Sequence, residues 1–199
     1  YEYDNQGRLI KTTRPYQGYA DGSYYNPGGI EFTLTQYENS PLNRVISVTP
    51  PNGHATTTTY GKNTSAITVP GGTSYAANTL FETKVTDPDN RVVFTYTDKK
   101  GRVILTKQTN TSGTSPAETY NVYDDKDRLT MVIPPGDTTS SAELIYRYQY
   151  SGDDLLLKKK VPGAAEVKMS YNNRDLLVFS QDGNLLSQNK SLGTKYDDY

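Results

Sequence analysis

The chain contains 199 residues, and its 21 Lys and Arg are balanced by 22 Asp and Glu, giving a formal net charge of −1. This balance offers no attractive field for nucleic acid, and no run of about 18 apolar residues predicts a membrane span or an export signal. Cysteine is absent, which excludes disulfides and thiolate metal sites. Hydrophobic residues make up only 34% of the chain while 18 residues are Tyr, a composition that favours thin, half-exposed β-sheets because tyrosine carries a polar hydroxyl on a large ring.

A short motif begins the chain, Tyr-Asp-Asn-Gln-Gly-Arg-Leu at residues 3–9. An Asp that follows a strand tyrosine can accept hydrogen bonds from the backbone of the next turn, and a Gly three residues later permits a positive φ. Arg-Leu then begins the second strand, which runs in the opposite direction. The motif therefore predicts a hairpin tip between two antiparallel strands.

Degenerate copies of the motif follow along the chain. A variant with a longer turn covers residues 37–45, and residues 56–60 and 66–69 predict extra strands before a connector at 74–78. Leading tyrosines then stand at positions 96, 123, 150, 171 and 196, and spacings of 27, 27, 21 and 25 residues are typical of a repeat architecture. The residues to which we assign a structural role in the motif are Tyr3, Asp4, Gly7, Arg8, Leu9, Tyr96, Asp98, Gly101, Arg102, Tyr123, Asp124, Arg128, Leu129, Tyr171 and Leu176.

One motif position departs from glycine. Asp127 stands where the first copy has Gly7, and we interpret it as a residue that tolerates the left-handed backbone region at modest cost. Prolines end several outgoing strands, as at Pro50, Pro134 and Pro162, because proline cannot donate a ladder hydrogen bond. We expect an array of hairpins joined by linkers.

The predicted fold class is all-β, with repeated antiparallel β-hairpins forming one continuous curved sheet. We divide it into irregular hairpins with extra strands at 1–73 and a more regular hairpin array at 74–199, both within a single β structure cut from a longer protein. A lone hairpin is marginal in water, so neighbouring units must pair side by side. The exposed sheet edges of such a fragment favour edge-to-edge self-association.

The Tyr-Asp-x-x-Gly-Arg-Leu pattern resembles the YD repeats of bacterial RHS proteins, of insecticidal-toxin shell proteins and of teneurins. Residues 37–45, 75–80 and 160–164 are similar to the N-terminal part of the long RHS-repeat proteins of Bacteroidota. The resemblance covers nearly the whole chain. It implies a segment of a β-spiral that wraps into a hollow shell around a C-terminal toxin or variable domain, in a secreted or cell-surface protein.

On this resemblance the chain is a non-catalytic wall or scaffold segment, and its partners are the remainder of its own shell and an enclosed toxin. Nothing in it resembles the core-associated region of the family, with its self-cleaving aspartates. We expect no enzyme activity and no cofactor. The only histidine, His54, lies in a polar turn-like stretch and is interpreted as an exposed loop residue.

Acidic clusters provide weak candidates for Ca²⁺, namely Asp87, Asp89, Asp124 and Asp125, but neither cluster has the spaced ligand series of an EF-hand loop. Turn capping explains these carboxylates better. The basic run at 158–160 could attract an acidic surface, and we interpret it as protection of a strand edge. The alternative function is an adhesion or carbohydrate-binding module that uses exposed tyrosines, and a glycan hydrolase is a third, less favoured, hypothesis.

Overall fold

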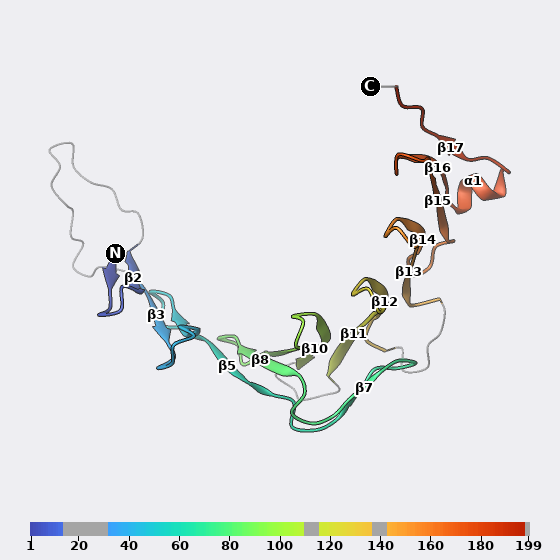
Figure 1. Cartoon of the computed structure of the whole chain (residues 1–199). Coiled ribbons are helices and arrows are strands. Elements are labelled where there is room, and N and C mark those ends of the chain that lie inside the picture. Colours follow the sequence, from blue (N-terminus) through green and yellow to red (C-terminus); the bar gives the residue numbers. More distant parts are fainter. Residues whose placement is uncertain (14–31, 110–115, 137–142, 198–199) are drawn as a thin grey trace, which may run out of the picture.

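The computed structural model describes residues 1–13, 32–109, 116–136 and 143–197. Fifteen strands form one open antiparallel sheet in the order β1-β2-β3-β4-β5-β8-β9-β10-β11-β12-β13-β14-β15-β16-β17, and β6 and β7 form a separate two-stranded sheet. The sheet bends into an arc, with β1 at one end and β17 at the other (Figure 1). The prediction of an all-β curved sheet built from hairpins is confirmed.

The strands are short and follow one another in chain order. Their bounds are β1 (Glu2–Tyr3), β2 (Leu9–Thr13), β3 (Phe32–Tyr37), β4 (Val45–Thr49), β5 (Thr56–Lys62), β6 (Ile67–Thr68), β7 (Ser74–Tyr75), β8 (Phe81–Thr86), β9 (Val92–Thr97), β10 (Val103–Thr109), β11 (Ala117–Tyr123), β12 (Leu129–Ile133), β13 (Tyr146–Tyr150), β14 (Leu156–Lys160), β15 (Val167–Tyr171), β16 (Leu177–Gln181) and β17 (Leu192–Gly193). One short helix, α1 (Gly183–Ser187), begins after Asp182, whose side chain accepts a hydrogen bond from the Leu185 amide.

A β-bulge follows the tip of six hairpins. In β9–β10, for example, Val103 pairs with Thr97 and Leu105 with Tyr96, so Ile104 has no partner. A bulge leaves one residue outside the ladder and increases the local twist of the strand. Figure 1 shows the hairpin ends in the second half of the chain turning toward the inner side of the arc. The six bulged residues are Ile10, Ile46, Ile104, Thr130, Leu157 and Val178.

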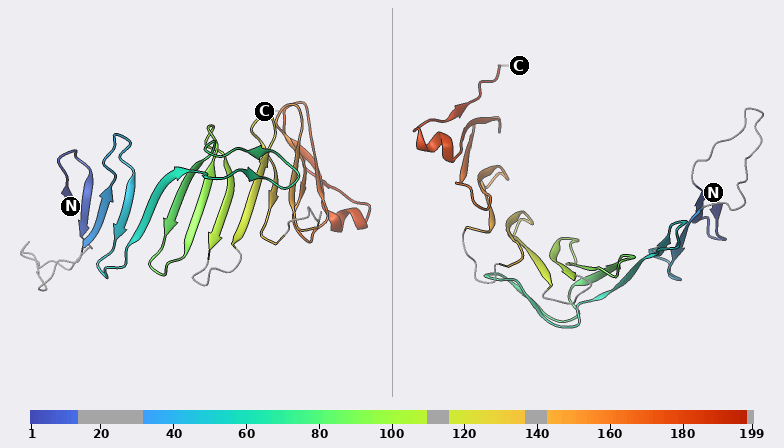
Figure 2. Two further views of the ribbon diagram at one scale, coloured as in Figure 1. Left: turned by 90° about the horizontal axis from the view of Figure 1, so that it is seen from below. Right: turned by 180° about the vertical axis from the view of Figure 1, so that it is seen from behind.

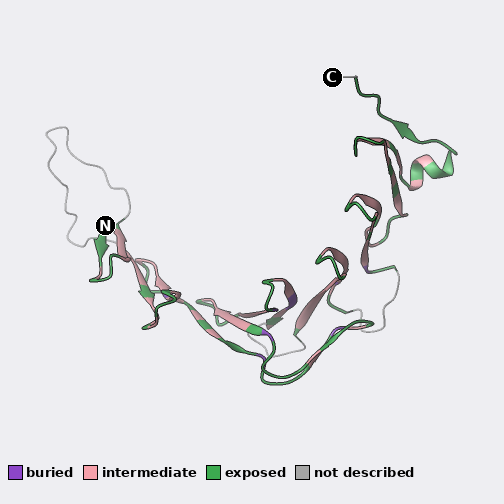
Figure 3. Ribbon diagram, viewed as in Figure 1, coloured by how far each residue is buried: buried purple, intermediate pink, exposed green. Residues whose placement is uncertain are grey.

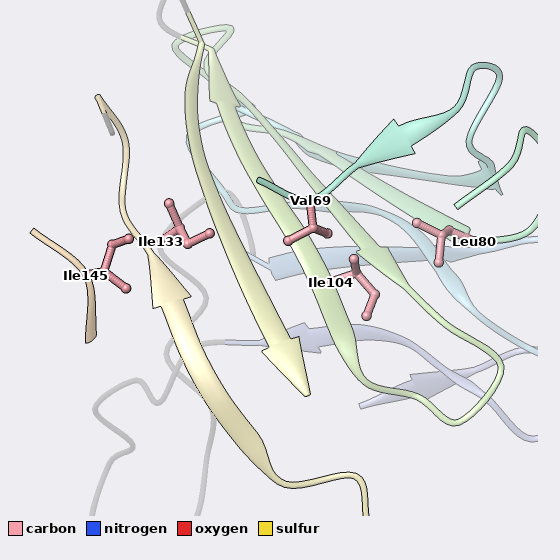
Figure 4. Packing of buried hydrophobic residues seen from close by; sticks show 5 residues of the cluster. All are labelled: Val69, Leu80, Ile104, Ile133 and Ile145. Atoms are coloured by element: carbon pink, nitrogen blue, oxygen red, sulfur yellow. The ribbon is translucent and has the colours of Figure 1, made fainter. Parts of the chain in front are cut away.

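The sheet is thin, and most side chains along it are only half-buried (Figure 3). Most of the buried hydrophobic residues that the structure describes form a small cluster near the middle of the arc, and the buried polar residues are Ser47, Asn63 and Asp98. Val69, Leu80 and Ile104 lie together there, while Ile133 faces Ile145 a little farther along (Figure 4). Tyrosine rings pack against this cluster, as the composition predicts.

An arm, defined as residues 63–80, takes the place of a tight tip between β5 and β8. It crosses the outer side of the arc over the strands that follow β8 (Figure 2, left). Its two strands pair Ile67 with Tyr75 and Thr68 with Ser74, so the connector predicted at 74–78 is wrong at its first two residues. The division that we placed between residues 73 and 74 falls inside this arm, while the main sheet runs on from β5 to β8.

The buried Asn63 closes the base of the arm. Its side-chain amide nitrogen donates to the carbonyls of Ser65 and Ala76, both at 2.8 Å, and its amide oxygen accepts from the Leu80 backbone at 2.8 Å. Its own backbone N–H donates to the Leu80 carbonyl, and its carbonyl accepts from Asn78. All its hydrogen-bonding groups therefore have partners, as a buried amide requires.

The basic run at 158–160 lies on β14, which pairs with β13 on one side and β15 on the other. It is therefore inside the sheet, and our interpretation of it as protection of a strand edge is wrong.

We predict that Asn63→Ala lowers the free energy of unfolding of the arm by about 2–3 kcal/mol, because several buried backbone groups lose their partners. Amide hydrogen exchange of residues 64–79 should accelerate. Asn39→Ala, at an exposed position, is the matched control and should leave exchange unchanged. Equal exchange in both variants would contradict the assigned role of Asn63.

Candidate functional site: the tip row

Six hairpin turns lie at the same end of the strands along the sheet, and we call them the tip row. They are residues 4–8, 38–44, 98–102, 124–128, 151–155 and 172–176. In the tip at 98–102, the Oδ1 atom of Asp98 accepts from the backbone of Lys100 at 2.9 Å and of Arg102 at 3.0 Å. Gly101 supplies the positive φ of 81° that closes the turn. Asp4 and Asp124 accept in the same pattern.

Other polar residues take the place of the aspartate in later tips. Ser151 and Asn172 each accept from the same two backbone positions. In the longer second tip Glu38 accepts from the Arg44 backbone and from the Ser40 hydroxyl, which itself accepts from the Leu42 backbone. Two hydrogen bonds from the Arg44 guanidinium, at 2.8 and 2.7 Å, together with the one from Ser40, lower the pKa of Glu38 to about 2. The tip is thus a capped turn that accepts several side chains.

The arginine of the motif bonds first to its own tip. The Nε atoms of Arg8, Arg102 and Arg128 each donate to the Oδ2 atom of the tip aspartate at 2.7 Å. Burial raises the pKa of Asp98, but the hydrogen bonds from Arg102 outweigh it, so that its pKa lies below the ordinary value. This carboxylate therefore stays charged and paired.

The same arginine also reaches the next hairpin. Arg102 Nη1 donates to Asp127 at 2.6 Å, and Arg128 Nη1 donates to Asp154 at 2.7 Å. In the first pair of tips, Arg8 Nη1 donates to the Asn43 amide oxygen at 2.9 Å. These three acceptors all have positive φ, between 52° and 65°. Asp127 is therefore more than a tolerated substitute for glycine, because its side chain receives the arginine of the preceding tip.

Each arginine is also stacked over a tyrosine of the following hairpin. The guanidinium carbon lies 4.8 Å from the ring centre in Arg8–Tyr37, 4.1 Å in Arg44–Tyr60, 5.0 Å in Arg102–Tyr123 and 4.9 Å in Arg128–Tyr150. Such cation–π contacts contribute about 0.5–1 kcal/mol each at exposed sites.

The hydroxyl of that tyrosine donates to the backbone of the preceding hairpin, and we call the residues that do so bridging tyrosines. Tyr150, for example, donates to the Leu129 carbonyl at 3.0 Å. In every case the accepting carbonyl belongs to the residue just before a bulge, where the ladder is interrupted. The six pairs are Tyr37–Leu9, Tyr60–Val45, Tyr123–Val103, Tyr150–Leu129, Tyr171–Leu156 and Tyr196–Leu177, with distances of 2.9 to 3.1 Å.

The residues assigned to the motif do not all occupy these roles. Tyr123 and Tyr171 are bridging tyrosines, and Leu9 and Leu129 supply carbonyls for such bonds. Tyr96 lies one residue before the bridging position of its strand. That position is held by Thr97, which pairs with Val103 in the same way as Tyr123 pairs with Leu129.

The two ends of the row also differ from its middle. Tyr3 is 59% exposed in the first strand. In the last two tips Leu155 and Leu176 stand at the arginine position, so these tips have a bridging tyrosine after them without a stacked arginine.

Two of the four candidate metal ligands, Asp87 and Asp124, are turn caps. Asp87 accepts from the backbone of Asp89 and Arg91, in a turn at the opposite end of β9 from the tip row. Asp124 caps its tip, and neighbouring Asp125 is exposed. Across residues 1–13, 32–109, 116–136 and 143–197, no three His, Cys, Asp or Glu side chains are grouped to hold a metal ion. His54 is exposed in the turn before β5.

A polar cleft of about 360 Å³ lies between the arm and two tips. Its lining includes Tyr75 from the arm, and Lys100, Arg102 and Asp127 from the tips. Lys100 and Arg102 are both ion-paired with Asp127, at 2.7 and 2.6 Å. These charges are thus used to join neighbouring tips.

No protein-family model and no curated protein sequence matches the chain. Crystal structures of TcdB2-TccC3-TEV and TcdB2-TccC3 share its fold, with TM-scores of 0.62 and 0.61 at 16% and 17% identity. The alignments cover 91% and 90% of this chain but only 9% of the other chain in each case. In the described part of the chain, no helix is long and apolar enough to cross a membrane.

We predict that Tyr150→Phe destabilises the contact between the β11–β12 and β13–β14 hairpins by about 1 kcal/mol, because it removes one hydrogen bond and leaves the ring in place. Hydrogen exchange at residues 124–133 should rise. Tyr148→Phe is the matched control, two residues away on the same strand and face, with no hydroxyl hydrogen bond among the described residues. Identical exchange profiles for the two variants would refute the bridging role.

A second prediction concerns a variant that restores the arginine missing from the tip at 151–155. Ser151→Asp with Leu155→Arg should stabilise the last hairpins by about 1 kcal/mol, since Asp175 already has positive φ and Tyr171 is already a bridging tyrosine. Exchange across residues 167–181 should slow. Ser151→Asp with Leu155→Lys carries the same charges without a planar guanidinium, and equal protection in this control would argue against the stacked geometry.

Proposed function

We propose that this chain is a non-catalytic wall segment of an RHS-type shell, in a secreted or cell-surface protein. Its principal partner is the remainder of the same shell, which encloses a C-terminal toxin or variable domain. The observation that carries this proposal is the tip row, in which six bridging tyrosines each bond to the preceding hairpin.

The shared fold with TcdB2-TccC3 supports a role within a larger assembly, since this chain matches only 9% of the length of that protein. The YD-type sequence pattern points in the same direction. The fifteen strands of the open sheet are hydrogen-bonded in chain order. Further hairpins could therefore extend the sheet at either edge strand.

The use of the tyrosines favours a wall over a glycan-binding platform. A platform for sugar stacking needs open aromatic faces. Here the rings of Tyr37, Tyr60, Tyr123 and Tyr150 are covered by arginines, and their hydroxyls are bonded to backbone carbonyls. The carboxylates of the tips are likewise occupied by arginine and backbone donors, which supports the absence of catalysis.

Electron cryomicroscopy of the polypeptide from the complete reading frame tests this function. We expect further strands paired to β1 and β17, and one face of the sheet lining a closed hollow. An open array with solvent on both faces would overturn the proposal. A glycan array probed with this chain separates the alternative, because micromolar binding lost on replacing exposed tyrosines would identify a carbohydrate-binding module.

A further inference from the structure

Four cations occupy one face of the sheet over β13, β14 and β15, and we call Arg147, Lys158, Lys160 and Lys168 the basic face. Side chains alternate between the two faces of a strand, and directly paired residues share a face. Arg147 is paired with Lys160, and Lys158 with Lys168. All four side chains therefore project from the same surface.

This arrangement places like charges directly opposite each other twice. Paired residues on neighbouring antiparallel strands have Cβ atoms about 4.5–5.5 Å apart, and like charges at that distance destabilise the pairing. Both pairs lie on strands inside the sheet, so they do not serve to block an edge. Sheets normally avoid like charges at directly paired positions. Where a sequence breaks this rule and the fold gains no stability from it, the surface is characteristically a functional one.

Few acidic groups offset these charges. Glu166 lies 3.7 Å from Lys158, and Glu143 lies 3.4 Å from Lys160. Both contacts are long and partly exposed, which makes them weak. Within the part of the chain that the structure describes, no carboxylate forms an ion pair with Arg147 or Lys168. The basic face thus has four cations against two carboxylates.

We propose that the basic face binds an extended acidic polypeptide segment. Side chains on one face of an extended strand repeat about every 6.6–6.8 Å, which matches the separation of Lys158 and Lys160 along β14. Arg147 supplies the planar donor that suits a carboxylate, and Gln149 and Gln181 extend the Lys158–Lys168 row with neutral amides.

The chemistry of the surface favours a peptide over an acidic polysaccharide. Sugar rings bind by stacking on aromatic side chains, and β13, β14 and β15 carry none on this face, because Tyr146, Tyr148 and Tyr150 alternate with Arg147 and Gln149 and lie on the opposite face of β13. A single exposed ring, Phe179 on the neighbouring β16, shares the face of Lys168. The proposal is independent of the shell function, because it concerns only the charge pattern of three strands.

The test is a titration of the full 199-residue chain with fluorescein-labelled dodecaglutamate at low salt, followed by fluorescence anisotropy. The variant Lys158→Gln with Lys168→Gln should weaken binding by about tenfold or more, and added salt should weaken binding to the parent chain. Lys159→Gln is the matched control, because Lys159 is exposed on the opposite face between two residues of the basic face. It should change the affinity by less than about twofold.

Thermal unfolding provides the second readout. Removing like-charge pairs should leave the Tm of the Lys158→Gln, Lys168→Gln variant equal to or above that of the parent chain. A lower Tm would mean that the lysines serve the fold. Equal loss of binding in the Lys159→Gln control, absence of dodecaglutamate binding, or binding of a size-matched heparin oligosaccharide alone would each overturn the proposal.

Discussion

The hydrogen bond from a bridging tyrosine to the preceding hairpin is the contact on which the rest of the sheet depends. A two-stranded hairpin is marginal in water, and this thin sheet has few fully buried side chains to compensate. The bulge after each tip interrupts the ladder, and the carbonyl just before it accepts the tyrosine hydroxyl. Turn, bulge and bridging tyrosine therefore form one unit, because each of the six hairpins with a bulge offers the acceptor that a following tyrosine uses.

The arginines add charge to the same contact. Arg128 bonds to its own Asp124, stacks on Tyr150 and donates to Asp154, so one guanidinium fixes three positions in two hairpins. The acceptor Asp154 needs a positive φ to stand in that place. Asp and Asn tolerate this backbone region far better than most residues, which explains why they replace glycine wherever an arginine precedes them.

Local turn chemistry made the hairpin tips predictable from sequence. A capping Asp, the Gly and the Arg of the motif close the turn by contacts within five residues, as in residues 4–8. The partner of a bridging tyrosine lies 15 to 28 residues away, and no local pattern identifies it. The misaligned Tyr96 shows the consequence. A shift of one residue moves a side chain to the other face of a strand, and here Thr97, not Tyr96, holds the position that corresponds to a bridging tyrosine.

The arm and the basic run were harder to predict for a related reason. Asn63 looks like an ordinary turn residue in the sequence, but its burial and its bonds to Ser65, Ala76 and Leu80 depend on how the arm folds back. The lysines at 158–160 were assigned to an edge because nothing in their sequence reports strand order. Only the pairing of β14 on both sides places them within the sheet.

The C-terminal hairpins combine two departures from the rest of the sheet. Leu155 and Leu176 replace the motif arginine, so contacts between tips there rely on tyrosine alone. The same strands carry the opposed pairs Arg147–Lys160 and Lys158–Lys168. We expect both features to lower the stability of this region relative to the middle of the arc, and regions that bind partners are drawn from the less stable part of a fold. An acidic segment on the basic face would neutralise the repulsion and reinforce the sheet where its own contacts between tips are fewest.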